Sequence, residues 1–131
     1  MLLQKRAEKK YHSGGLWTNA CCSHPRPNES TYDAANRRLV EEMGFECELV
    51  YQFNFIYKAE LDQGLTEHEF DHVFFGLYNG EVNPNSEEVL DYKYVDVQDV
   101  LSDMDLNPDK YTVWFKIIFN KVNKVRNGNS I

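Results

Sequence analysis

The chain has 131 residues, of which 42% are hydrophobic and 27% charged, so its length and composition are those of one globular domain and not of a disordered protein. Its net charge of −7 argues against duplex nucleic acid as a partner, because proteins that bind nucleic acid gather Lys and Arg. We find no apolar run long enough to span a membrane and no signal-peptide pattern, and we therefore expect a cytoplasmic protein without a membrane partner. The three cysteines leave at least one thiol free, which favours a reducing compartment. The expected assembly is a monomer or a weak homodimer.

The first third of the chain predicts two short strands followed by a helix. Ser or Thr at the start of the helix and Asp33 in its first turn supply capping groups, and a glycine follows its apolar stripe. The expected elements are strands at Leu2–Arg6 and Leu16–Cys21, and a helix from Ser30 or Thr31 to Met43 that stops at Gly44.

The rest of the chain alternates strands with two C-terminal helices. In Glu48–Lys58 the apolar residues alternate, so Leu49, Tyr51, Phe53, Phe55 and Tyr57 are expected to point one way. Glu67, Glu69 and Asp71 should likewise share one face of a strand at Glu67–Tyr78, and Asn79–Gly80 is a turn that closes a hairpin or ends this strand. The remaining expected elements are a strand at Asp91–Val95, a helix at Val97–Met104, a helix from after Pro108 to about Lys124, and a polar tail at Arg126–Ile131. This order predicts an α+β fold, an α/β/α sandwich.

One spacing pattern in the chain is specific. Glu29 is followed by seven residues and then by the run Arg37–Phe45. The pattern resembles the Nudix box, G-x5-E-x7-R-E-U-x-E-E-x-G-U, where U is a bulky aliphatic residue. The positions in register are Glu29, Arg37, Leu39, Glu41, Glu42 and Gly44. The resemblance implies a single Nudix domain over residues 1–131, with a mixed sheet, a central Nudix helix and C-terminal helices.

Two positions depart from the box: Ser23 stands where it has Gly, and Arg38 where it has Glu. In hydrolytic Nudix enzymes the glutamates of the box hold divalent cations that activate water. A cation at Arg38, four residues before Glu42, suits holding a diphosphate more than cutting it. The clustering of cations at Lys5–Lys10 and Arg37–Arg38 in an acidic chain also predicts a small anionic ligand.

The residues around the box resemble one branch of this superfamily. Trp17–Pro25 is similar to the W-T-N-x-x-C-x-H-P motif of type I isopentenyl-diphosphate isomerases, and Glu67–His68–Glu69 is similar to their E-x-E motif. The resemblance covers essentially the whole chain. It implies an enzyme that interconverts isopentenyl and dimethylallyl diphosphate through a carbocation-like state.

The same resemblance implies a role for each matching residue. Cys22 and Glu69 would be the acid and base, with Glu69 hydrogen-bonded to Tyr57, and Trp114 would stabilise positive charge through its ring face. Mg²⁺ and/or Mn²⁺, or Zn²⁺ in the His/Glu site, would be the cofactors. The implied metal ligands are His24, Glu67 and Glu69, with Glu42 holding a Mg²⁺ at the diphosphate; the implied diphosphate-binding residues are Arg6, Lys10 and Arg38.

The metal site is where the chain departs from the family, whose site uses three His and two Glu. Only His24, Glu67 and Glu69 match, and the other two histidines would lie upstream of Met1, so the chain is expected to be N-terminally truncated relative to the family. It could be a fragment, a natural short form, or a form that recruits His12 or a partner subunit. His68 and His72 alternate away from Glu67 and Glu69. We expect weak metal binding and an isomerase activity that is reduced or needs high metal concentrations.

Each motif also has an alternative interpretation. Cys21 is expected to be structural, and periodicity alone makes Tyr57 and Trp114 core residues as readily as site residues. Two other functions compete with isomerisation: a Nudix-type diphosphate hydrolase, and a non-catalytic diphosphate-binding module. Release of phosphate would favour the first, and binding without turnover would favour the second.

Overall fold

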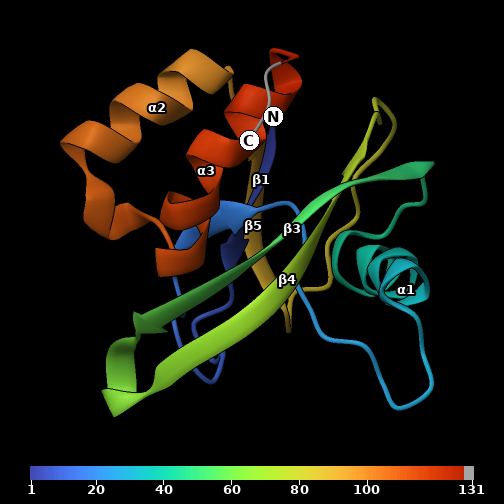
Figure 1. Ribbon diagram of the computed structural model, residues 1–131, viewed down its shortest axis with the longest axis horizontal. Coiled ribbons are helices and arrows are strands. Elements are labelled where there is room, and N and C mark those ends of the chain that lie inside the picture. The colour runs from blue at the N-terminus through green and yellow to red at the C-terminus, as the bar shows by residue number, and fades with distance from the viewer. Residues whose placement is uncertain (129–131) are drawn as a thin grey trace.

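The computed structural model describes residues 1–128, and the last three residues of the expected polar tail, 129–131, lie outside the described part. The fold is α+β, with a three-stranded antiparallel sheet in the order β2-β1-β5 and a separate antiparallel pair β3-β4 (Figure 1). The mixed sheet expected from the family resemblance is thus two antiparallel sheets, and the parallel contact is an isolated bridge between Trp17 and Tyr111. The elements are β1 Leu2–Arg6, β2 Trp17–Asn19, α1 Thr31–Met43, β3 Leu49–Glu60, β4 Thr66–Gly76, β5 Val89–Tyr94, α2 Val97–Leu106 and α3 Val113–Arg126.

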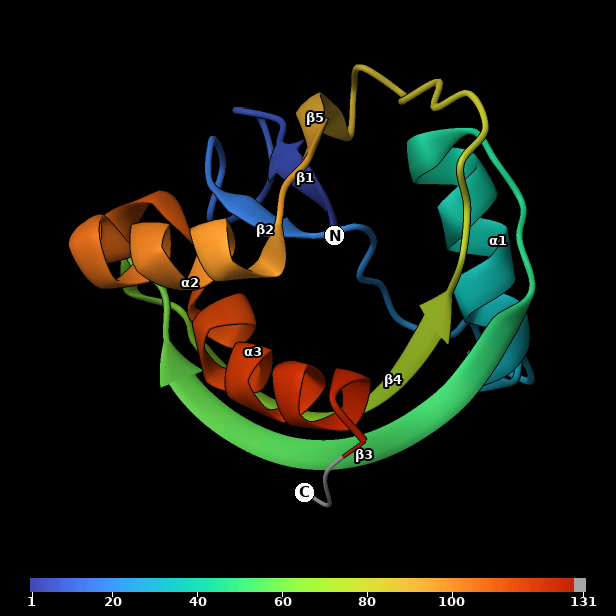
Figure 2. The ribbon, with the colours of Figure 1, turned by 90° about the horizontal axis from the view of Figure 1, so that it is seen from above.

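The long hairpin β3-β4 curves around α3, with α1 on the other side of the molecule (Figure 2). Alternate residues of β3 form the contact, and Phe53, Phe55 and Tyr57 are buried against the apolar stripe of α3. The expectation that Tyr51 shares their face is wrong. A bulge between Tyr51 and Phe53 adds one residue and reverses the alternation, leaving Tyr51 46% exposed.

Residues 61–65 close the hairpin, because β4 follows them directly and pairs with β3 along its whole length. The Asn79–Gly80 turn closes no hairpin. It lies after the end of β4 at Gly76, in the segment that leads to β5, and β5 pairs with β1.

Helix α1 begins and ends where its capping residues predict. Ser30 accepts a hydrogen bond from the amide of Asp33 at 3.0 Å. Gly44 has φ of 72°, and a Cβ there would lie 2.2 Å from the carbonyl oxygen of Asn83. Both conformation and space therefore require glycine at this position.

The interior has two apolar clusters. The larger joins β3, α2 and α3 and includes Phe115 and Phe119, and the smaller joins Leu39 and Met43 of α1 to Val89 of β5. Within residues 1–128, no helix combines the length and apolarity needed to cross a membrane. The space between the two clusters holds the candidate site.

Candidate active site

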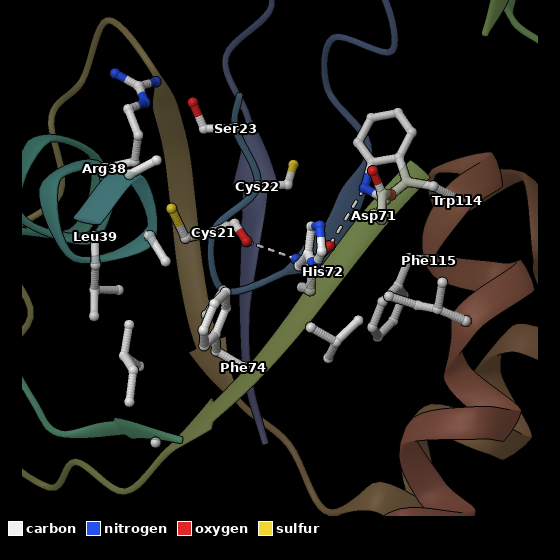
Figure 3. Close-up of a pocket in the computed structure, with 18 of the residues that line it drawn as sticks. Cys21, Cys22, Ser23, Arg38, Leu39, Asp71, His72, Phe74, Trp114 and Phe115 are labelled. Atoms are coloured by element: carbon white, nitrogen blue, oxygen red, sulfur yellow. Dashed lines mark hydrogen bonds between the residues drawn. The ribbon is translucent and has the colours of Figure 1, made fainter. Parts of the chain in front are cut away.

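A cavity of about 1430 Å³ lies between the two apolar clusters. It is larger than most small-ligand pockets, which hold about 300–1,000 Å³. Its lining combines aromatic side chains with the cysteine, the carboxylates and the cations of the sequence motifs, and Figure 3 shows part of it. The predicted site residues that line it are Arg6, Lys10, Cys22, His24, Arg38, Tyr57, Glu67, Glu69 and Trp114.

The two adjacent cysteines face different clusters. Cys21 packs against the α1 cluster, where its Sγ lies 3.5 Å from Oε2 of Glu42. Cys22 packs against the α3 cluster, and Figure 3 shows it on the side of the cavity toward Asp71 and Trp114. Burial, and after it the charge of Glu42, raises the pKa of the Cys22 thiol to about 12. Cys22 therefore carries its proton at neutral pH.

Three carboxylates of β4 face the cavity as the alternation predicts. Burial, followed by the charges of Glu69 and Glu67, raises the pKa of Asp71 to about 6, so the three side chains lie close enough to repel. His68, between Glu67 and Glu69 in the chain, is exposed on the opposite face. This end of the cavity holds concentrated negative charge.

Tyr57 donates its hydrogen bond to Oε1 of Glu67, and not to Glu69 as expected. Tyr57 and Glu69 are register partners across the hairpin, but the long tyrosine side chain reaches a diagonal neighbour two residues along the strand. Burial and the bond to Glu67 hold the pKa of Tyr57 well above its usual value. Tyr57 is thus a core residue and a site residue together, because its ring is buried while its hydroxyl contacts the carboxylate.

The ring of Trp114 is fixed by contacts at its edge and over its face. Its indole N–H donates to Oδ1 of Asn19 at 3.3 Å, and the guanidinium of Arg6 lies 5.1 Å from the ring centroid. Arg6 also donates to the carbonyl of His12 at 3.1 Å, and its buried Nε has no hydrogen-bond partner among residues 1–128. The indole therefore already holds one cation over its π system.

Lys10 and Arg38, the other expected diphosphate ligands, share an acid that the sequence did not mark. Glu88 pairs with Lys10 through one oxygen and lies 3.4 Å from Nη2 of Arg38 through the other. Arg38 also contacts Glu41 at 3.1 Å and Glu42 at 3.0 Å. Glu88 lies far away in sequence, in the segment before β5, and no local motif signals it.

Glu42 lies outside the cavity lining. It is 3% exposed, accepts from Nε2 of Gln4 at 3.0 Å and pairs with Arg38, and burial raises its pKa. Its oxygens already have protein partners, so it could reach a Mg²⁺ only by giving up these contacts.

The other expected metal ligands are of suitable chemistry but are not gathered around one point. Nε2 of His24 lies 3.6 Å from Oε1 of Glu69, and the His24 side chain is 70% exposed. Nitrogen and carboxylate donors suit Zn²⁺, Mn²⁺ or Mg²⁺. Within the described part of the chain, however, no three His, Cys, Asp or Glu side chains are placed to hold one ion. The residues present do not form a ready-made metal site.

The remaining box residues have a structural role. Arg37 makes two hydrogen bonds of 2.8 Å to the carboxylate of Glu29 and one of 2.8 Å to Glu41. These contacts tie the loop that follows the Cys-His segment to α1. The box therefore fixes the loop relative to α1. The neighbour of Arg37 in the chain, Arg38, places a positive charge at the wall of the cavity.

Comparison with known proteins agrees with this geometry. A family model described as NUDIX domain matches residues 1–115, the class that the fold and the Glu29–Gly44 pattern define. Two solved structures share the fold. They are a MutT protein from Methanosarcina mazei, with TM-score 0.73 and 20% identity over 95% of this chain and 83% of that one, and DR0079 from Deinococcus radiodurans, with TM-score 0.76 and 11% identity over 92% and 72%.

Curated relatives narrow the class. "Isopentenyl-diphosphate Delta-isomerase 2" of Aromatoleum aromaticum is 50% identical over 98% of this chain and 68% of its own length. The protein of the same name from Photorhabdus laumondii is 53% identical over 92% of this chain and 68% of its own. This chain belongs to the isopentenyl-diphosphate Delta-isomerase family of Nudix enzymes. It spans about two thirds of the length of these relatives.

Proposed function

We propose that this chain interconverts isopentenyl diphosphate and dimethylallyl diphosphate. The observation that carries the proposal is one cavity lined by a protonated thiol, paired carboxylates, an indole ring and three cations. Such a set can protonate an alkene, stabilise a cation, remove a proton and hold a diphosphate. The names of the 50% identical relatives support the same reaction.

The proton steps follow from the state of the groups. Cys22 holds a proton at neutral pH, so in the forward direction it gives that proton to the terminal CH2 carbon of the substrate, and positive charge develops at C3. The carboxylate of Glu69 then takes a proton from C2, and the electron pair left behind forms the C2=C3 bond. One proton is added and one removed; Glu69 then releases its proton to solvent and Cys22 takes one from solvent, which restores the enzyme. The reverse reaction exchanges the two roles.

Trp114 and Tyr57 support these steps in different ways. The indole ring, which already faces the cation of Arg6, offers π density to the developing carbocation. Tyr57 fixes one carboxylate oxygen of Glu67, so that the negative charge of the β4 face stays in place beside the reacting carbons. Neither residue needs to exchange a proton with the substrate.

The diphosphate would bind to Lys10 and Arg38 at the other end of the cavity and to Arg6, whose guanidinium lies beside Trp114. Two buried guanidinium Nε groups, on Arg6 and Arg38, have no hydrogen-bond partner in the described part of the chain and would gain one from a phosphate oxygen. In the free enzyme Glu88 forms ion pairs with both Lys10 and Arg38. The diphosphate would therefore displace one carboxylate from two cations.

We propose weak binding of Mg²⁺ or Mn²⁺ at His24, Glu67 and Glu69, because these donors must move together before they can hold an ion. A divalent cation bound there would stabilise the ionised carboxylates. None of the steps above depends on it. The three cysteines are free thiols, which supports a reducing compartment such as the cytoplasm.

The test is ³¹P and ¹H NMR of isopentenyl diphosphate incubated with the chain, with and without millimolar Mg²⁺ or Mn²⁺. We expect dimethylallyl diphosphate with no release of inorganic phosphate, and faster conversion with added metal. Inorganic phosphate or a monophosphate would instead indicate hydrolysis, and saturable binding without conversion would indicate a non-catalytic module.

A further inference from the structure

His12 lines the cavity although no motif of the sequence marks it. It lies in the loop between β1 and β2, and 18% of its side chain is exposed. Its Nε2 atom is 3.6 Å from Oε2 of Glu67, and burial, followed by the charge of Arg6, lowers the pKa of His12. Its ring stands edge-on to Trp114, with 5.7 Å between centroids and an angle of 88°.

The loop holds His12 in this position through two anchors. Arg6 donates to the carbonyl of His12 at 3.1 Å, and the amide of Ser13 lies 3.1 Å from both carboxylate oxygens of Asp62 at the tip of the β3-β4 hairpin. Ser13 has a φ of 56°, which is strained for a residue with a Cβ. The Ser13 hydroxyl, 3.1 Å from Nδ1 of His12, also fixes the orientation of the ring.

Two glutamates of β4, two residues apart, therefore each contact a histidine from a loop. His24 contacts Glu69, and His12 contacts Glu67 at the same distance of 3.6 Å. The two glutamates differ in what else they contact. Glu67 has one oxygen bound by Tyr57 and the other beside His12, whereas Glu69 contacts the exposed His24. Glu67 thus has a protein contact on each of its two oxygens.

We propose that His12 is a positioning residue of this active site. It holds Glu67, and through Glu67 the hydroxyl of Tyr57, and it supports the edge of Trp114. The acid held between His12 and Tyr57 keeps its place while Glu69 exchanges protons. The inference rests on the proposed isomerisation and adds a residue that the family motifs do not include.

The kinetic test is His12→Ala. We expect kcat for isopentenyl diphosphate to fall about tenfold while KM stays within about twofold, because a displaced group beside the reacting carbons affects the transition state more than the bound substrate. His12→Gln should recover most of the loss, since its amide N–H can still reach Glu67. His68→Ala, on the exposed opposite face of β4, is the matched control and should leave both constants unchanged.

A rise in KM alone, an unchanged kcat, or a His12→Gln variant as slow as His12→Ala would overturn the inference. A second measurement needs no turnover. We expect the thermal unfolding midpoints of His12→Gln, Glu67→Gln and the double variant to be non-additive, because the two side chains are in contact. If the wild-type chain fails to isomerise the substrate, the proposed function fails. Additive shifts of the unfolding midpoints would show, independently of turnover, that His12 and Glu67 do not interact.

Discussion

The two ends of the cavity are built on opposite electrostatic plans. At the β4 end, the charges of Glu67, Glu69 and Asp71 repel one another. Two histidines and a tyrosine contact the two glutamates there. At the α1 end, Arg38 and Lys10 already pair with internal acids, including Glu88. The difference indicates that the β4 end retains unbalanced charge for proton transfer, whereas the α1 end keeps its cations ordered until an anion replaces a carboxylate.

The largest expected effect is at the reacting end. Cys22→Ala should lower kcat by about 10³-fold, within the range for the loss of a general acid, while diphosphate binding persists. Cys21→Ala is the matched control, because that neighbouring thiol faces the α1 cluster. Steady-state rates of both variants and calorimetric binding of isopentenyl diphosphate check this. Comparable losses in the two variants would mean that the cysteines do not differ in function.

Removing a cation from the α1 end should cost stability as well as binding. Arg38→Ala leaves the buried Glu42 without its ion-pair partner, which we expect to destabilise the fold by about 3–5 kcal/mol. Urea unfolding gives the free energy of unfolding. Glu42→Gln added to Arg38→Ala should recover much of that loss, because no unpaired charge is left buried. A double variant as unstable as Arg38→Ala would refute the explanation.

Releasing the cations should have the opposite effect on affinity. Glu88→Gln removes the carboxylate shared by Lys10 and Arg38, so the diphosphate no longer competes with it. We expect Kd for isopentenyl diphosphate to fall about three- to tenfold, measured by calorimetry at fixed ionic strength. The adjacent exposed Glu87→Gln is the control for loss of overall charge. Weaker binding in Glu88→Gln would mean that Glu88 aligns the cations rather than blocking them.

The smallest expected effect is the pH dependence of stability at Glu29, a residue of the Nudix box that lies outside the cavity. Hydrogen bonds from Arg37 hold the pKa of Glu29 at about 2, below its unfolded value near 4.5. A depressed carboxyl pKa stabilises the fold above the unfolded pKa, and this contribution is lost as pH falls from about 4.5 to 2. Glu29→Gln should therefore unfold at lower urea near neutral pH, with the gap to wild type narrowing over that window. A difference in urea midpoint that stays constant with pH would contradict the explanation based on the charge of Glu29.

Local signals predicted part of this structure well. The capping serine and Gly44 set the ends of α1, and alternation placed Glu67 and Glu69 on one face, because these features depend on neighbouring residues alone. The bulge in β3 was not predictable by alternation, since an extra residue changes the face of everything before it.

The contacts inside the site were harder to predict. Motif spacing identified many of the residues that line the cavity, but not that Tyr57 contacts Glu67 across a strand diagonal. Glu88 and His12 enter the site from a connecting segment and a loop that no motif covers, and their positions depend on tertiary packing. Glu42 matches its motif, but its carboxylate pairs with Arg38 and accepts a hydrogen bond from Gln4. It therefore lies outside the cavity.

Isotope incorporation in D₂O tests the central claim most directly. If the thiol of Cys22 protonates the alkene after exchange with solvent, dimethylallyl diphosphate formed from isopentenyl diphosphate should carry deuterium in a methyl group, detected by ¹H and ²H NMR. We predict one deuteron per molecule of product early in the reaction, and about 10³-fold less labelled product in the same time from the Cys22→Ala variant. Product without solvent deuterium, or labelled product at the wild-type rate from Cys22→Ala, would contradict the account.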